Sequence, residues 1–155
     1  MSIEICAVGR RHDAALAAFF EIIGSDEGGR FFTPHPMTGE AASRLAAYRG
    51  EDLYYVMTIN DEIVGYGMLR GWDEGYEVPS VGMFIRSGFR GKGLGRLFMN
   101  FLRVAAALRG AEQLFLHVDQ ENDVALKLYR SLGYEIKREG NHERLVGRLA
   151  LVCKS

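Results

Sequence analysis

The segment Val81–Gly95 carries the clearest chemical signal, because a strand-like run is followed there by a glycine-rich turn and a helical pattern. The turn is Arg90-Gly91-Lys92-Gly93-Leu94-Gly95, and glycines at such a turn let the backbone approach a ligand closely. The first turn of a helix adds unpaired N–H groups and the positive end of the helix dipole, which attract phosphate. Arg90, Lys92 and Arg96 add positive charge, so the segment predicts a diphosphate site.

Two well-known phosphate motifs do not match this turn. A P-loop requires Gly-Lys followed by Ser or Thr, whereas Lys92 is followed by Gly93. The dinucleotide fingerprint places its third glycine five positions after the first, whereas Gly95 lies four positions after Gly91. A regulator that binds ATP or NAD is therefore disfavoured. A glycine turn that only caps a helix remains open from this motif alone, because the chain holds 19 glycines.

A second motif further along the chain makes the sequence resemble a known family. Arg90-x-x-Gly93-x-Gly95 after a strand resembles the R/Q-x-x-G-x-G/A signature of the GNAT superfamily, the acetyl-CoA-dependent N-acetyltransferases. Asn122 and Tyr129 are seven residues apart, like the family's cofactor-contacting Asn and general-acid Tyr, and Leu132-Gly133-Tyr134 follows. The motifs cover Val81–Tyr134, and the order of elements fits over nearly the whole chain.

The resemblance implies how acetyl-CoA, the acetyl-donor co-substrate, would bind. Backbone groups of the strand would pair with the pantetheine arm like a missing neighbour, and the Ile85 N–H would hold the thioester oxygen. Amides of the glycine turn would hold the pyrophosphate. Asn122 would contact the pantetheine, and Tyr129 would protonate the departing thiolate. The expected cofactor-binding residues are Met83, Phe84, Ile85, Arg90, Gly91, Lys92, Gly93, Leu94, Gly95, Arg96 and Asn122.

Asn122 and Tyr129 can each also be interpreted as purely structural residues. Tyr129 also fits a core aromatic on an amphipathic helix, one turn beyond Ala125. Asn122 also fits a helix N-cap, the commonest role of Asn before a helix, and the two roles can coexist.

His117 is the second candidate catalytic residue. In relatives that acetylate protein N-termini, the resemblance places a glutamate general base five residues before the Asn, where this chain has His117. An imidazole, with a pKa of about 6.5, is suited to take a proton from an ammonium, directly or through water. A half-buried strand histidine with a satisfied hydrogen bond is the alternative.

An acidic, aromatic loop, Trp72-Asp73-Glu74-Gly75-Tyr76-Glu77, precedes the cofactor strand. An amine acceptor is cationic in solution, so these acids would attract it, and one of them is an alternative general base. A solvated charged surface is the structural alternative. The expected acceptor-site residues are Asp73, Glu74, Glu77 and His35, whereas His12 and His142 are expected on the surface.

Hydrophobic periodicity identifies the elements that must position these residues. Segment 24–36 is expected to be a loop with a tucked aromatic pair. The order predicts an α/β, GNAT-like fold, a mixed and mostly antiparallel central sheet of about seven strands flanked by about four helices. Strands are expected at 3–8, 53–59, 62–69, 79–86, 114–118, 134–138 and 144–152, and helices at 12–23, 38–50, 93–109 and 122–132.

Length, charge and cysteine usage limit the class of protein. The 155 residues predict one domain, 1–155. Lys plus Arg is 19 and Asp plus Glu is 20, a balance that disfavours a nucleic-acid partner. Without a run of about 18 apolar residues or a signal-like start, no membrane partner is expected and the cytoplasm is the default. Cys6 and Cys153 have neither metal-ligand nor disulfide spacing, so we expect two buried thiols and no metal.

Together these features predict an N-acetyltransferase that moves the acetyl group of acetyl-CoA to a primary amine by direct attack in a ternary complex. A small amine, an amino sugar and a protein N-terminus all remain open as acceptors. The alternative from another class is a non-catalytic acyl-CoA-binding or regulatory module, which Tyr129 disfavours. A homodimer through the closing hairpin is implied by the resemblance alone.

Overall fold

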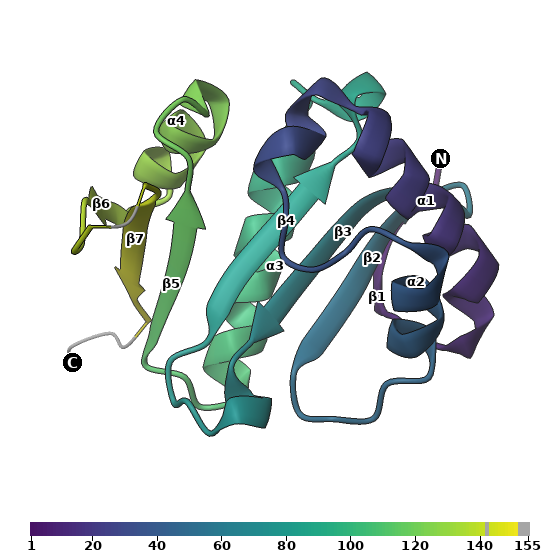
Figure 1. The fold of residues 1–155 in the computed structure, drawn as a ribbon, viewed down its shortest axis with the longest axis horizontal. Coiled ribbons are helices and arrows are strands. Elements are labelled where there is room, and N and C mark those ends of the chain that lie inside the picture. The colour runs from purple at the N-terminus through teal and green to yellow at the C-terminus, as the bar shows by residue number, and fades with distance from the viewer. Residues whose placement is uncertain (142, 152–155) are drawn as a thin grey trace.

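The computed structural model describes residues 1–141 and 143–151 (Figure 1). In this part of the chain seven strands form one sheet in the order β1-β2-β3-β4-β5-β7-β6, with the single parallel pair between β4 and β5. The strands are β1 Ile3–Ala7, β2 Leu53–Ile59, β3 Glu62–Arg70, β4 Ser80–Ile85, β5 Gln113–Val118, β6 Glu135–Lys137 and β7 Leu145–Ala150. The predicted mixed, mostly antiparallel α/β fold is confirmed.

Four α-helices cover the two faces of this sheet. They are α1 Asp13–Ser25, α2 Gly39–Ala46, α3 Leu94–Leu108 and α4 Asp123–Ser131, joined by the short 3-10 turns η1 Arg10–His12, η2 Glu27–Phe31, η3 Trp72–Glu74 and η4 Ser87–Phe89. Helices α1 and α2 lie in front of the sheet in Figure 1, and α3 lies behind it. Each face therefore buries its own apolar cluster.

The two clusters follow from strand alternation, because successive side chains of a strand point to opposite faces. Phe98 and Leu102 of α3 are fully buried together with Leu114 and Leu116 on one face. Phe20 of α1 packs with strand residues on the other face. In the described part of the chain, no helix combines the length and the apolar character needed to cross a bilayer.

Strands β4 and β5 are paired at one end only, so a gap opens between them toward their C-terminal ends. Their pairing is limited to Ser80 opposite Phe115, next to a hydrogen bond in which the Phe115 N–H donates to the Pro79 carbonyl at 3.2 Å. Beyond this point the two strands diverge toward their C-terminal ends (Figure 1). The sheet thus opens between its two halves.

The structure corrects two expectations. His12 is buried, with 8% of its surface exposed, because its Nδ1 accepts the Gly9 N–H at 2.9 Å and its Nε2 lies 3.8 Å from the Cys6 sulfur. Segment 24–36 is not an open loop throughout, since the Asp26 side chain accepts the Gly28 N–H and caps η2. Cys6 is half-buried, whereas His142 and Cys153 lie outside the described residues.

Candidate active site

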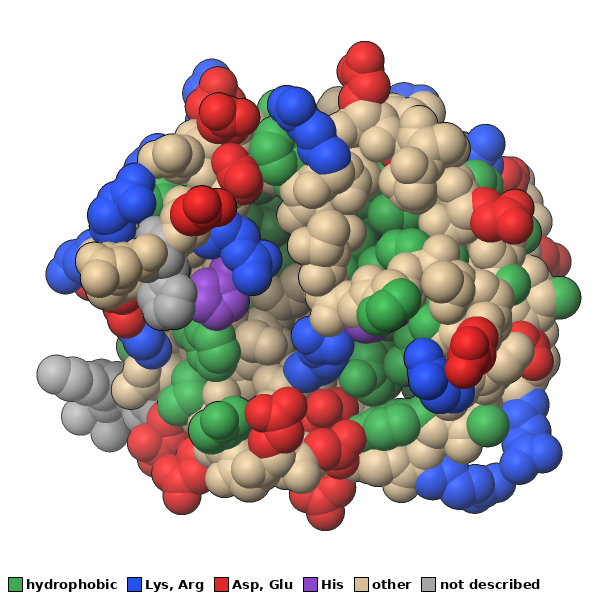
Figure 2. All heavy atoms as spheres, in the orientation of Figure 1, with side chains coloured by type: hydrophobic (Ala, Val, Ile, Leu, Met, Phe, Trp, Pro, Cys, Tyr) green, Lys and Arg blue, Asp and Glu red, His purple; other side chains and the backbone are tan. Residues whose placement is uncertain are grey.

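A cleft of about 850 Å³ occupies the opening between β4 and β5. Figure 2 shows it as a hollow on the face seen there, with basic side chains at its rim. Its walls come from η2, β4, the glycine turn, the start of α3, the end of β5 and one side of α4. This volume lies within the range of small-molecule and cofactor sites.

The backbone of β4 turns groups toward the cleft that are not paired with β5, as the register shows. The Arg86 N–H donates to the Val64 carbonyl at 2.9 Å, so every second residue of β4 bonds to β3. Met83 and Ile85 fall between these residues and turn their backbone groups toward β5, where the ladder is missing. Phe84 does not fit the backbone role expected of it, because its N–H and C=O face Tyr66 of β3. It reaches the cleft by its side chain alone.

The glycine turn has the backbone conformation that its sequence requires. Gly91 and Gly93 have φ angles of +78° and +86°, the left-handed region that glycine adopts without strain. A Cβ on Gly95 would lie 3.3 Å from the Met83 methyl group, so glycine also allows α3 to approach β4 closely.

The turn brings most of its predicted residues to the cleft. The cleft is lined by Arg90, Gly91, Gly93, Gly95 and Arg96. Lys92 and Leu94 do not line it, since Lys92 is exposed and Leu94 is buried in the core. With no acidic residue in the first turn of α3, the site can hold the two negative charges of a diphosphate.

Asn122 and Tyr129 both line the cleft from α4. The Asn122 side chain accepts the Ala125 N–H at 3.3 Å, so it caps α4 and faces the cleft as well. The Tyr129 ring is 8% exposed and packs 5.9 Å from the Tyr134 ring. Burial raises the pKa of Tyr129 to about 12, so its hydroxyl stays protonated at neutral pH. Tyr129 can therefore act as a proton donor.

His117 lies between this cleft and a second hollow of about 320 Å³. Its side chain is exposed and lies on the same face of β5 as Phe115, whose ring is 5.6 Å away. Glu139 and Arg148 line the second hollow and form a two-bond ion pair, with both N–O distances at 2.9 Å. These hydrogen bonds, and to a smaller degree the charge of His117, lower the pKa of Glu139. No sequence motif points to Glu139 or Arg148, because both lie beyond Tyr134, where the recognised motifs end.

The acidic loop 72–77 lies away from the cleft. Asp73 accepts hydrogen bonds from the Tyr48 hydroxyl and from the Glu51 N–H, which lower its pKa and tie the loop to the segment before β2. Arg109, directly after α3, lies over the Trp72 ring at 4.8 Å. The loop is thus at the far end of α3, a 15-residue helix about 22 Å long, from the glycine turn. Asp73, Glu74 and Glu77 do not line the cleft.

His35 is held in place by hydrogen bonds and does not belong to the cleft. Its Nδ1 donates to the Pro36 carbonyl at 2.8 Å, and its Nε2 accepts the Tyr66 hydroxyl at 2.8 Å. Its ring lies 5.3 Å from the Phe20 ring, and burial lowers its pKa, so the neutral form is favoured. His35 does not line the cleft.

The sequence also missed one wall of the cleft. The segment Glu27–Phe32, called here the η2 wall, contributes Glu27, Gly28, Arg30, Phe31 and Phe32 to the lining. The only signal was the adjacent aromatic pair in a segment that otherwise resembled a loop. The described residues contain no group of three or more His, Cys, Asp or Glu side chains placed to hold a metal ion.

Comparisons with known proteins agree with this geometry. The family model described as the acetyltransferase (GNAT) family matches residues 16–134. An acetyltransferase of Pectobacterium atrosepticum is 31% identical over 84 residues, a match that spans 54% of this chain and 58% of that relative.

Among solved structures, the GNAT domain of S. lividans PAT has a TM-score of 0.82 at 16% identity, covering 96% of this chain and 90% of that one. A putative acetyltransferase from Salmonella typhimurium, solved with acetyl-CoA, has a TM-score of 0.74 at 17% identity, covering 98% and 95%. These likenesses concern the fold, and the family model covers more than half of the chain. The chain therefore belongs to the acetyltransferase (GNAT) family.

Proposed function

We propose that the protein transfers the acetyl group of acetyl-CoA to a primary amine in a ternary complex. One observation carries the proposal: the edge of β4 that β5 leaves without a ladder, the glycine turn and Tyr129 all face one cleft. The volume of this cleft and the arginines that line it suit a pantetheine arm that ends in a diphosphate. Relatives with the same fold have been solved with CoA or acetyl-CoA.

Three groups at the cleft have separate roles in the proposed reaction. His117 accepts a proton from the ammonium of the acceptor, directly or through water, so that the free amine can attack the thioester carbon. The Ile85 N–H faces the cleft and donates to the oxygen on which negative charge develops. As the carbon–sulfur bond breaks, the Tyr129 hydroxyl gives its proton to the departing sulfur, and the phenolate that is left takes the surplus proton of the attacking nitrogen.

The position of His117 supports it over the 73–77 acids as the general base. His117 lines the cleft and borders the second hollow, from which an acceptor can reach the cleft. The three acids lie at the other end of α3. The second hollow offers both Glu139 and Arg148, so the acceptor class stays open among a small amine, an amino sugar and a protein N-terminus.

A thermal-shift comparison of acetyl-CoA, CoA, ATP and NAD tests the cofactor. A ligand that binds only the native state at 100 times its Kd stabilises that state by about 2.7 kcal/mol, a shift of several degrees for a domain of this size. We expect shifts with acetyl-CoA and CoA alone. Stabilisation by ATP or NAD, without any effect of CoA, would contradict the proposal.

Thiol release with a panel of primary amines then separates an enzyme from an acyl-CoA-binding module. An enzyme releases CoA at a rate that depends on one class of amine. A binding module would show the CoA-induced thermal shift without thiol release for any amine in the panel.

A further inference from the structure

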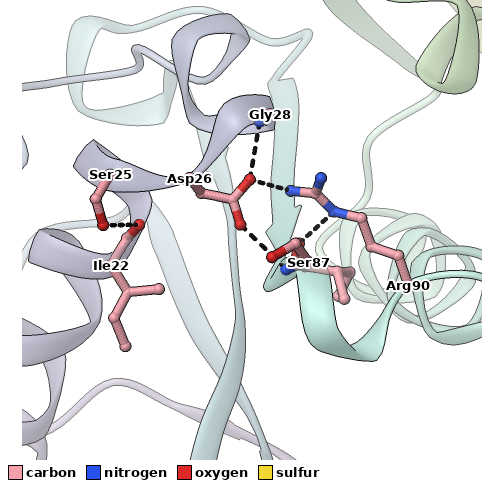
Figure 3. A network of polar contacts seen from close by, with 7 residues as sticks. Ile22, Ser25, Asp26, Gly28, Ser87 and Arg90 are labelled. Atoms are coloured by element: carbon pink, nitrogen blue, oxygen red, sulfur yellow. Dashed lines mark hydrogen bonds and ion pairs between the residues drawn. The ribbon is translucent and has the colours of Figure 1, made fainter.

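A buried carboxylate joins the η2 wall to the glycine turn (Figure 3). The Asp26 side chain is 3% exposed and accepts the Gly28 N–H at 2.8 Å, the Ser87 N–H at 3.1 Å and Arg90 Nη2 at 3.1 Å, and the Ser87 hydroxyl also donates to it. Burial raises the pKa of Asp26, but the hydrogen bonds and the Arg90 charge outweigh it, so the pKa lies below its usual value. The carboxylate is therefore ionised at neutral pH and pairs with Arg90.

The guanidinium of Arg90, the first residue of the GNAT motif, donates hydrogen bonds to other groups of the protein. Its Nε donates to the Ile85 carbonyl at 2.8 Å, and its Nη2 donates to Asp26. The guanidinium carbon lies 5.0 Å from the centre of the Phe84 ring. Arg90 thus connects the end of β4 to the segment that begins the η2 wall.

The wall packs directly against this guanidinium. A Cβ on Gly28 would lie 2.7 Å from both terminal nitrogens of Arg90, so a larger residue there would displace the guanidinium. Because the same guanidinium holds Asp26 and fills the space beside Gly28, any shift of Arg90 must be transmitted to the wall.

The Asp26–Arg90 pair connects two parts of the cleft with different tasks. The glycine turn after Arg90 is the candidate diphosphate site. The η2 wall lines the same cleft on the front face. The wall also contacts β4 through Phe32, whose ring lies 5.7 Å from the Phe84 ring.

We propose that Asp26 and Arg90 are positioning residues that couple cofactor binding at the glycine turn to the order of the η2 wall. Resting on the proposed function, this inference adds that the cofactor prepares the wall for the acceptor through one ion pair. A bound diphosphate restrains the turn, and Arg90 and Asp26 carry that restraint to Glu27–Phe32.

Hydrogen exchange of the full chain, with and without CoA, measures this coupling. In the wild type, we expect saturating CoA to slow amide exchange both in the glycine turn and in the η2 wall. Asp26→Asn keeps the shape of the side chain but removes its charge. In this variant, CoA should still protect the turn, while its protection of the wall falls at least fivefold.

Two further variants complete the design. Arg90→Lys keeps the charge but cannot bridge Ile85 and Asp26, so it should uncouple the wall in the same way. The double variant should be no more uncoupled than either single variant, because both remove one bridge. Glu62→Gln is the matched control: it breaks the exposed Arg86–Glu62 pair, 2.8 Å long and next to Ser87, and should behave as the wild type.

The outcomes separate the two proposals. If CoA protects the turn in the wild type but leaves the wall unchanged, or if Asp26→Asn and Arg90→Lys both retain full wall protection, the coupling is refuted and the proposed function stands. If CoA protects neither region of the wild type, the proposed function fails and the coupling fails with it. Additive effects in the double variant would show that the two residues do not act through one pair.

Discussion

Tyr129 meets two requirements of a general acid, since it lines the cleft and its hydroxyl remains protonated. Removing that hydroxyl in Tyr129→Phe should lower kcat by about 10²–10⁴-fold, the usual contribution of a positioned proton donor. The Kd for CoA, measured by calorimetry, should stay within about twofold, because the ring and its packing are kept. Unchanged thiol release would assign Tyr129 to the core alone.

His117 determines the pH dependence if it is the general base. The neutral imidazole accepts the proton, so kcat/KM in the wild type should fall as pH drops through the pKa of this residue. His117→Ala should remove that acid limb and lower the plateau. Glu74→Gln and Glu77→Gln should keep the wild-type profile, because both residues lie outside the cleft. The reverse pattern would assign the base to the acidic loop.

Tyr134 offers a test of stability. Its hydroxyl is buried and has no hydrogen-bond partner among the described residues, and such a group destabilises the native state by about 1–3 kcal/mol. Tyr134→Phe should therefore raise the free energy of unfolding by about 1 kcal/mol, or about 2–4 °C in Tm. Tyr66→Phe is the control, since it removes the hydroxyl that donates to His35 and should lower Tm.

At the scale of elements, the glycine turn depends on backbone conformation more than on space. A Cβ on Gly93 would meet nothing within 4 Å, but its φ is +86°, which costs a residue with a side chain about 1–2 kcal/mol. Gly93→Ala should thus shift the turn and weaken CoA binding at least tenfold by calorimetry. Gly88→Ala has equal space without positive φ and should bind CoA as the wild type does. Equal affinity for all three proteins would remove the turn from the binding site.

The elements themselves were predicted well because their signals are local. Asn60 and Asp61 were identified as a hairpin turn, and both adopt positive φ, at 49° and 69°. The helix predicted over 93–109 is α3, since its apolar stripe has the helical period. The second helix was predicted to reach residue 50 but ends at Ala46, because the following segment turns to bring Tyr48 to Asp73.

At the scale of the whole molecule, two histidines make stability depend on pH. Burial lowers the pKa of both His12 and His35 below the ordinary value, so the folded state favours their neutral forms. A depressed histidine pKa contributes stability that is present above about pH 6.5 and is lost as pH falls through the folded-state pKa. The free energy of unfolding should therefore decrease from pH 7 to pH 5.

Urea denaturation at several pH values checks this dependence. His35→Asn and His12→Asn should each flatten the curve between pH 7 and pH 5, although both lower the stability at pH 7. A wild-type slope that persists unchanged in both variants would place the dependence on other groups.

The sequence by itself determined the family, the order of elements and two local motifs, the glycine turn and the Asn122–Tyr129 pair. These features are set by spacing within one strand–turn–helix unit or one helix, where geometry follows from neighbours along the chain. The family and the fold class were both confirmed.

Only the tertiary structure decided which distant segments meet. It separated the 73–77 acids from the cleft, paired His35 with Tyr66 and joined Asp26 to Arg90 across 64 residues. It also limited the β4–β5 pairing to one position, which opens the cleft between the two strands. Contacts of this kind depend on how the two packed faces fix the path of each connecting segment, and no spacing within a single element encodes that path.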